Sequence, residues 1–227
     1  DRLDQKFEQD TVTFAAYGQM TWRATEKLAV DYGLRISFEE KDVFLRQQYR
    51  DTGLILLLGL GSEEYTLDTT RKEQNISPKI SVRYHWTDDI MTYGTIADGY
   101  KAGGFNPFAP TIDTSQFDEE TSRTFEVGVK SKVFDGRVTA NFTYFYTQFH
   151  DLQLSTPGQN GSTFLITNAG QATSQGIEAE VQALVLPNLF VTSSLGLADA
   201  VFDEYPDAPC QINEEGPCDN AGRNIAE

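Results

Sequence analysis

The sequence is poor in the residue types on which several common functions depend. Its 227 residues include two histidines and two cysteines, and neither histidine lies near the cysteines in the sequence, which argues against a metal centre built from these side chains. It has 18 lysine and arginine residues against 34 aspartate and glutamate residues, and the net charge of −16 argues against binding to nucleic-acid phosphates. The longest apolar run, residues 54–60, is shorter than the roughly 18 residues of a membrane-spanning helix. We therefore expect no bound metal, no nucleic-acid partner and no transmembrane helix.

Motifs of catalysis are missing as well. The chain has no phosphate-binding loop, no nucleophile elbow and no cysteine–histidine cluster, so we expect neither an enzyme nor a bound cofactor. His85 and His150 are isolated, and we interpret each as a solvated polar residue rather than a metal ligand. The N-terminal stretch DRLDQKFEQD is charged and does not begin with methionine, which indicates a mature piece or a fragment rather than a signal peptide.

The two cysteines, Cys210 and Cys218, lie in the polar stretch CQINEEGPC. This spacing, inside a loop rich in proline, glycine, asparagine and glutamate, favours a local disulfide formed in an oxidising compartment. Two other interpretations stay open. One is a pair of free thiols, and the other is a metal site, which would need further cysteine or histidine ligands nearby.

Residues 121–154 predict a hairpin from two independent signals. Asp135-Gly136 is typical of a two-residue type I′ turn, which needs positive φ at both central positions. Pairing outward from this turn gives one nearly apolar face and one mostly polar face, and a slip of one residue would mix the two. The expected pairs on the apolar face are Val133/Val138, Ser131/Ala140, Val129/Phe142, Val127/Tyr144 and Phe125/Tyr146.

Similar alternation recurs along the chain and predicts at least eight strands. Short turns, at 25–27, 87–89, 135–136 and 186–188, alternate with long connections, at 42–75, 102–120 and 155–170, before a polar stretch at 204–227. All long loops would then emerge at one end of the sheet, which is typical of a transmembrane β-barrel. Strands of 12–16 residues, with Asp31, Arg35 and Glu178 at mid-strand, fit a watery lumen better than the alternative, a soluble β-sandwich.

The alternation also leads to finer expectations. Pairing Trp22 with Leu28 keeps the apolar side chains of the first two strands on one face. The face of Tyr84 and Trp86 is expected to continue in Met91, Tyr93, Thr95 and Ala97. Trp22, Trp86 and Tyr93 would then form an aromatic girdle beside the short turns. We expect residues 42–75 to be a long functional loop, and short strands within it stay open because the pattern does not place them.

Three runs closely resemble, in this order and spacing, the later barrel of TonB-dependent outer-membrane receptors. They are residues 93–107 (YGTIADGYKAGGFNP), residues 117–154 with the E-T-S, E-x-G-x-K and DGR elements, and residues 166–205 with NAG and GIEAE. Residues 9–41 and 76–92 resemble the family more loosely, and His150 stands where a lysine is common. The resemblance implies an all-β fold, an antiparallel meander of about eight long strands within a transmembrane β-barrel of about 22 strands.

The resemblance also implies a function and a location. Members of the family lie in the bacterial outer membrane and take up ferric siderophores, cobalamin, haem or sugars, driven by the TonB complex. Residues 1–227 are then a partial barrel domain that lacks the plug domain, the TonB-box segment and the final strands. The implied partners are outer-membrane lipid, the protein's own plug domain, the TonB complex and a ferric siderophore or similar chelate. The alternatives are a passive or structural outer-membrane barrel and a secreted soluble β-domain that binds carbohydrate.

The candidate ligand contacts lie at the extracellular mouth. Aromatic and polar residues in and just before the second long connection are the ones we select: Tyr100, Phe105, Asn106 and Phe108. Packing within the loop is the alternative role for them. The residues expected to face the lumen are Glu126, Lys130, Asn141, Glu178 and Glu180. Three roles stay open for Glu178 and Glu180. The first is lining the lumen or contacting the plug, the second is ligand contact, and the last is acid–base chemistry. The apolar segment 53–61 is expected outside the membrane, as either a packed loop or a ligand contact.

Overall fold

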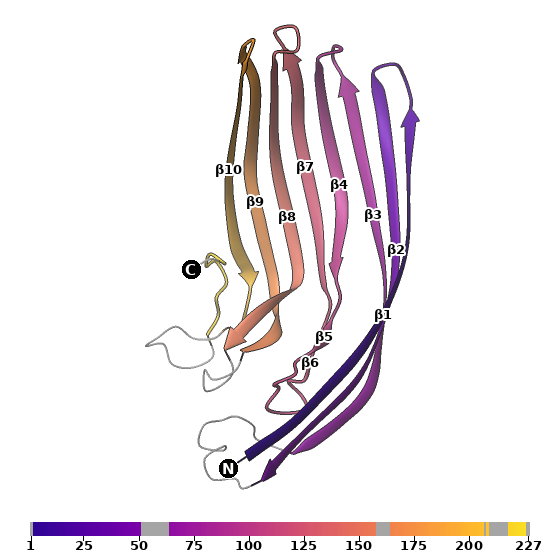
Figure 1. The fold of residues 1–227 in the computed structure, drawn as a ribbon, viewed down its shortest axis with the longest axis vertical. Helices are drawn as coiled ribbons and strands as arrows, with labels where there is room; N and C mark the ends of the chain where they lie inside the picture. The colour runs from indigo at the N-terminus through magenta and orange to yellow at the C-terminus, as the bar shows by residue number, and fades with distance from the viewer. Residues whose placement is uncertain (1, 51–63, 158–163, 207, 209–217, 226–227) are drawn as a thin grey trace.

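The computed structural model describes residues 2–50, 64–157, 164–206, 208 and 218–225, which form one open, curved antiparallel sheet (Figure 1). Neighbouring strands follow one another along the chain, in the order β1-β2-β3-β4-β7-β8-β9-β10. Their bounds are β1 (Arg2–Arg23), β2 (Leu28–Arg50), β3 (Tyr65–His85), β4 (Ile90–Lys101), β7 (Glu120–Val133), β8 (Val138–Pro157), β9 (Phe164–Leu186) and β10 (Leu189–Glu204). A small separate ribbon pairs β5 (Gly104–Phe105) with β6 (Gln116–Phe117). Within the described ranges, no helix is long and apolar enough to cross a membrane.

Short turns join the strands at one end of the sheet, as predicted (Figure 1). Two of them are built alike around a threonine. The hydroxyl of Thr25 accepts from the backbone N–H of Lys27 and Leu28 at 3.2 and 2.9 Å, and that of Thr87 accepts from Asp89 and Ile90 at 3.2 and 3.1 Å. A hydroxyl that satisfies two turn N–H groups favours a tight connection over an extended loop.

The β7–β8 hairpin has the predicted register. Every predicted pair is present, from Val133↔Val138 beside the turn to Phe125↔Tyr146. Asp135 and Gly136 have φ values of 54° and 78°, and the Arg137 N–H donates to the Phe134 carbonyl at 3.1 Å. Phe134 also has a positive φ, 56°, so the left-handed stretch begins one residue earlier than a type I′ turn requires.

The same alternation extends across the sheet and gives it two chemically different sides. Phe142 lies beside Ala179 and Tyr144 beside Ile177, so the apolar set of β8 continues in β9, as predicted. We call this side the apolar face and the opposite side the polar face. Side chains of the apolar face are widely exposed, for example Val127 at 55% and Leu197 at 56%. An exposed apolar surface of this extent is typical of a face that another apolar medium covers.

Two predicted pairings differ from the structure. Trp22 pairs with Val30 rather than Leu28, because the turn closes between Ala24 and Leu28, and the shift of two residues leaves the faces unchanged. The prediction for β4 was wrong, because Tyr84 pairs with Thr92. The residues Met91, Tyr93, Thr95 and Ala97 therefore lie on the polar face. Both sides of β4 carry apolar residues, so alternation alone does not distinguish them, and Tyr93 does not belong to an aromatic girdle.

The long connection expected at 42–75 was also wrong. β2 continues to Arg50 and β3 begins at Tyr65, with unbroken pairing from Gln47↔Tyr65 to Leu28↔Tyr84. The pattern is hard to recognise because the apolar residues change sides here. Val43 and Leu45, 2% and 0% exposed, lie on the polar-face side. Likewise, β8 extends to Pro157 and β9 begins at Phe164, so much of 155–170 is strand. The apolar segment 53–61 lies outside the described residues.

The sheet divides at its long-loop end. Pairing of β3 with β4 ends at Lys79↔Ala97, although β3 continues beside β2 to Tyr65 and β4 continues beside β7 to Lys101↔Glu120. The residue that precedes Lys79 in β3 is Pro78, which has no N–H to donate to a neighbouring strand. Below this point in Figure 1, β1–β3 continue downward past the β5–β6 ribbon, whereas β4 and β7 lie above it.

Candidate functional site at the long-loop end

Residues 102–119, which we call the bridging loop, connect β4 to β7 on the polar-face side of the divided sheet. The β5–β6 ribbon holds the two ends of the loop together through the pairs Gly104↔Phe117 and Phe105↔Gln116. Two glycines permit this close approach. A Cβ at Gly104 would lie 2.6 Å from the Phe117 ring, and a Cβ at Gly103 would lie 2.6 Å from the Phe117 carbonyl oxygen. The Gly-Gly sequence is therefore a steric requirement of the ribbon.

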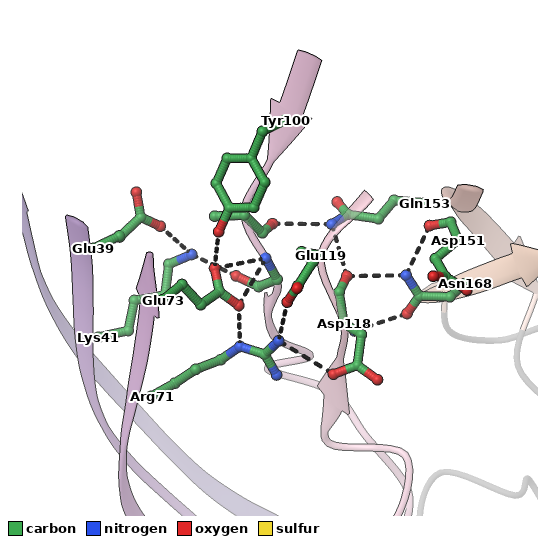
Figure 2. A network of polar contacts seen from close by, with 12 residues as sticks. Glu39, Lys41, Arg71, Glu73, Tyr100, Asp118, Glu119, Asp151, Gln153 and Asn168 are labelled. Carbon is green, nitrogen blue, oxygen red and sulfur yellow. Dashed lines mark hydrogen bonds and ion pairs between the residues drawn. The ribbon is translucent and has the colours of Figure 1, made fainter. Parts of the chain in front are cut away.

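Glu73 of β3 is the polar centre of the attachment to β1–β3 (Figure 2). Its carboxylate accepts from the Tyr100 hydroxyl at 2.6 Å and from the Gly103 backbone N–H at 3.1 Å. It also pairs with Arg71, whose guanidinium reaches Asp118 at 3.2 Å and Glu119 at 3.5 Å. The Glu73 and Arg71 side chains are 9% and 16% exposed, so these ionic contacts are partly shielded from solvent.

A second ion pair supports the first. Lys41 of β2 pairs with Glu39 and donates to the Gly103 carbonyl oxygen. Gly103 thus has its N–H bound by one charged side chain and its carbonyl by another, from two neighbouring strands (Figure 2). Hydrogen bonds to charged groups are stronger than neutral ones, so the backbone of the bridging loop is held firmly at this residue.

These contacts shift the titration of the groups involved. Burial acts to raise the pKa of Glu73, but the hydrogen bond from Tyr100 and the guanidinium of Arg71 outweigh it and lower that pKa below its ordinary value. Burial and the Glu73 carboxylate both raise the pKa of the Tyr100 hydroxyl. At neutral pH Glu73 is therefore ionised and Tyr100 keeps the proton that it donates.

An apolar contact lies beside the charged one. Phe105 of β5, 6% exposed, packs in a buried cluster with Val43, Leu45 and Tyr65. The Tyr65 hydroxyl donates to the Ala109 carbonyl at 2.8 Å. The residues that change sides in β2 therefore form a small core under the bridging loop.

The opposite side of the bridging loop is attached to β8 and β9 by amide side chains. The Gln153 amide donates to the carbonyls of Ala102 and Asp118, both at 2.9 Å. Asn168 accepts from the Asp118 N–H at 2.8 Å and donates to the Asp118 carbonyl at 2.9 Å (Figure 2). The loop is thus fixed to both parts of the divided sheet.

The four candidate ligand contacts are placed differently from one another. Tyr100 is bound to Glu73, Phe105 is in the small core, and Asn106 is 4% exposed. Phe108 is 62% exposed and the only one of the four with a largely free side chain. Ligand contact stays a prediction for all of them. Sequence reasoning missed Glu73 and Arg71, because no strand was assigned to 42–75.

The residues expected to face the lumen lie together on the polar face. Glu126 accepts from the Tyr93 hydroxyl at 2.5 Å, and the Lys130 ammonium lies 5.5 Å from the centre of the Tyr93 ring. The Asn141 amide lies 3.5 Å from the Glu180 carboxylate. A shallow groove of about 300 Å³ adjoins them; its lining includes Asn141, Thr143, Glu178, Glu180 and Ser194. The role of Tyr93 in this group was missed, because β4 was assigned to the wrong face.

Other candidate chemistry is dispersed. Cys218 is disulfide-bonded, and Cys210, its expected partner, lies outside the described residues. His85 lies on β3 beside a short turn, whereas His150 lies on β8 toward the long loops. Among the residues that the structure describes, no group of three or more histidine, cysteine, aspartate or glutamate side chains could hold a metal ion.

Comparison with known proteins places this sheet among receptors. The family model described as TonB dependent receptor-like, beta-barrel, matches residues 3–219. The pesticin receptor of Yersinia enterocolitica is 31% identical over 172 residues, which cover 75% of this chain and 23% of that receptor. The ferric-pyoverdine M114 receptor PbuA of Pseudomonas sp. (strain M114) is 27% identical over 176 residues, or 78% of this chain and 20% of that receptor. The chain thus spans about a quarter or less of the length of these relatives.

Solved structures show the same arrangement of strands. The ferric yersiniabactin uptake receptor FyuA from Yersinia pestis matches with a TM-score of 0.71 and 23% identity, over 88% of this chain and 28% of that one. The ferric-catecholate import receptor Fiu from E. coli K12 matches with a TM-score of 0.67 and 20% identity, over 88% and 29%. At these identities the likeness concerns the fold.

Proposed function

We propose that the complete protein imports a ferric siderophore or a similar scarce metal chelate, because this chain belongs to the TonB-dependent receptor-like β-barrel family of the bacterial outer membrane. The family consists of receptors and transporters rather than enzymes. The relatives whose names specify a chelate are receptors for ferric or other metal complexes. In this proposal the chain supplies part of the barrel wall and one fixed loop of the mouth.

The observation that carries the proposal is the open sheet. Within the described residues, β1 pairs only with β2 and β10 pairs only with β9, so the eight strands do not close on themselves. Open strand edges are not stable in lipid, where water cannot satisfy their N–H and carbonyl groups. Further strands must then complete the wall, and a wall of many strands leaves a lumen wide enough for a plug domain and a chelate.

The two faces of the sheet support an orientation. The apolar face contacts outer-membrane lipid, and the polar face, with Glu126, Lys130, Asn141, Glu178 and Glu180, faces the lumen and the plug domain. The short turns then lie at the periplasmic rim, and the bridging loop lies at the extracellular mouth. The plug domain carries the contact with the TonB complex, and no nucleic acid takes part.

Uptake in cells tests the proposal. A strain that carries the complete gene and a deletion strain are given a panel of ⁵⁵Fe-labelled siderophores, with and without an uncoupler that collapses the proton gradient. Accumulation of a chelate that requires both the gene and the gradient is the expected result. Accumulation that requires the gene but persists with the uncoupler would favour the alternative, a passive outer-membrane channel. Recovery of the protein from the soluble fraction would contradict both.

A further inference from the structure

Phe108 lies at the tip of a β-turn whose first and last residues are buried. The Ala109 N–H donates to the Asn106 carbonyl at 3.3 Å, which places Pro107 and Phe108 at the two central positions. Proline is favoured at the first of these positions because its fixed φ matches the turn. Asn106 is 4% exposed and Ala109 is 0% exposed, whereas Phe108 is 62% exposed. The turn therefore holds an aromatic ring out from a buried base.

Both backbone neighbours of Phe108 are held by side chains of the sheet. The Gln5 amide of β1 donates to the Pro107 carbonyl, and the Tyr65 hydroxyl of β3 donates to the Ala109 carbonyl at 2.8 Å. The backbone on either side of the ring is thus bound to two different strands. A side chain presented in this way loses little backbone freedom when it contacts a ligand.

Asn106 uses its whole amide to hold the base of the turn. Its Nδ2 donates to the carbonyls of Thr114 and Ile166, at 3.0 and 2.9 Å, and its Oδ1 accepts from the Ile166 N–H at 2.8 Å. Its backbone N–H donates to the Ser115 carbonyl at 2.8 Å. The polar atoms of this side chain are thus bound within the protein, and they fix the base of the turn that carries Phe108.

We infer that Phe108 is a preformed contact for an aryl group of the chelate, and that Asn106 is a positioning residue that acts through Phe108. The inference rests on the proposed function and narrows its substrate class to chelates that present aromatic rings. Ring–ring contacts are stronger than the burial of the same apolar area alone, so an aryl ligand gains more from Phe108 than an aliphatic one.

Binding to the purified full-length receptor in detergent micelles tests this inference. The probes are a ferric tris-catecholate, which presents aryl rings, and an aliphatic ferric tris-hydroxamate, with quenching of tryptophan fluorescence as the readout. Phe108→Ala is expected to raise the Kd for the catecholate about tenfold. If the receptor also binds the hydroxamate, the Kd for that probe should change less than about twofold. The matched control is Phe134→Ala, the same change at an exposed phenylalanine beside a short turn, which should leave both Kd values unchanged.

A double-variant cycle tests the positioning role. Asn106→Asp keeps the shape of the side chain but loses both N–H donors, and it should raise the catecholate Kd in the parent and not in the Phe108→Ala background. Independent, multiplying effects would overturn the role of Asn106. If Asn106→Asp does not fold, Tyr65→Phe replaces it in the cycle, because it removes the hydroxyl that donates to the Ala109 carbonyl of the same turn.

The outcomes separate this inference from the proposed function. An unchanged catecholate Kd in Phe108→Ala, binding of the hydroxamate alone, or loss of folded receptor in Phe108→Ala would each overturn the inference and leave chelate import standing. Failure of every ⁵⁵Fe-labelled siderophore to accumulate in a gene-dependent way would overturn the proposed function itself.

Discussion

Glu73 is the residue on which the charged contacts of the bridging loop converge. Its carboxylate binds a hydroxyl, a backbone N–H and a guanidinium, and its side chain is 9% exposed. Replacing Glu73 with glutamine removes the charge, and hydrogen bonds to an uncharged acceptor are weaker. We expect Glu73→Gln to increase hydrogen–deuterium exchange of amides in 102–117 about tenfold, corresponding to a loss of roughly 1–2 kcal/mol of local stability.

A neighbouring residue provides the control. Lys72→Gln removes an ion pair between β3 and β2 on the apolar-face side, where Lys72 and Glu40 are 69% and 44% exposed. Exposed pairs contribute little, so exchange in 102–117 should not change. Equal effects of the two substitutions would show that the bridging loop does not depend on Glu73.

The attachment of the bridging loop should also depend on pH. The pKa of Glu73 lies below its ordinary value of 4.5, so its contribution is present above that value and is lost as the pH falls through the lower, folded-state pKa. The pKa of Tyr100 is raised from 10.0, so its contribution is present below that value and is lost as the pH rises further. Amide exchange in 102–117, corrected for its intrinsic pH dependence, should be constant near neutrality and rise at the acidic end. In Glu73→Gln the acidic rise should disappear.

Gly128 allows the Tyr93 ring to lie against the sheet. A Cβ at Gly128 would lie 2.6 Å from the Tyr93 ring and 2.8 Å from the Phe142 carbonyl oxygen. We expect Gly128→Ala to displace the ring, break its hydrogen bond to Glu126 and lower the free energy of unfolding by about 1–3 kcal/mol. Urea unfolding of the complete barrel in lipid vesicles measures this. Gly18→Ala, where no heavy atom lies within 4 Å of the added Cβ, should be nearly neutral.

The β7–β8 hairpin is the element whose geometry is most directly set by its residues. Gly136 has a φ of 78°, a region that costs an L-residue roughly 1–2 kcal/mol. Gly136→Ala should therefore lower the free energy of unfolding by about that amount, whereas Asp135→Asn, which tolerates positive φ, should change it little. The same urea titration gives both values. A Gly136→Ala variant as stable as the parent would mean that the turn relaxes to another type.

The elements that could be predicted from the sequence are the strands that have an apolar side and a polar side. β7, β8, β9 and β10 alternate between apolar and polar residues, and the register of β7 with β8 followed from turn chemistry and period alone. β4 carries apolar residues on both sides, because Tyr93 covers a glycine on the polar face, and its assignment failed. β2 was ended too early and β3 was begun too late, because Val43 and Leu45 turn their apolar side chains toward the bridging loop. Only tertiary contact explains that change of side.

At the scale of the whole molecule, the sequence resemblance was confirmed by the family match over residues 3–219, and the all-β meander by the structure. The site was less accessible to sequence reasoning. Its residues come from β2, β3, β4, β8, β9 and the bridging loop, and no local motif joins Glu73 to Gly103 or Asn106 to Ile166. The bridging loop contacts β3 at Glu73, in the part of that strand that does not pair with β4.

The open edges of the sheet lead to a prediction about the whole arc. β1 spans 22 residues and β10 spans 16, and within the described residues neither has a partner on its outer side. Expressed without flanking sequence and refolded into lipid vesicles, residues 1–227 should therefore fail to form a closed barrel. The full-length protein should shift in mobility on heating in SDS gels and resist protease, whereas the isolated chain should show neither behaviour. A protected, heat-modifiable form of the isolated chain would mean that eight strands do close, and it would favour a small passive barrel over a receptor wall.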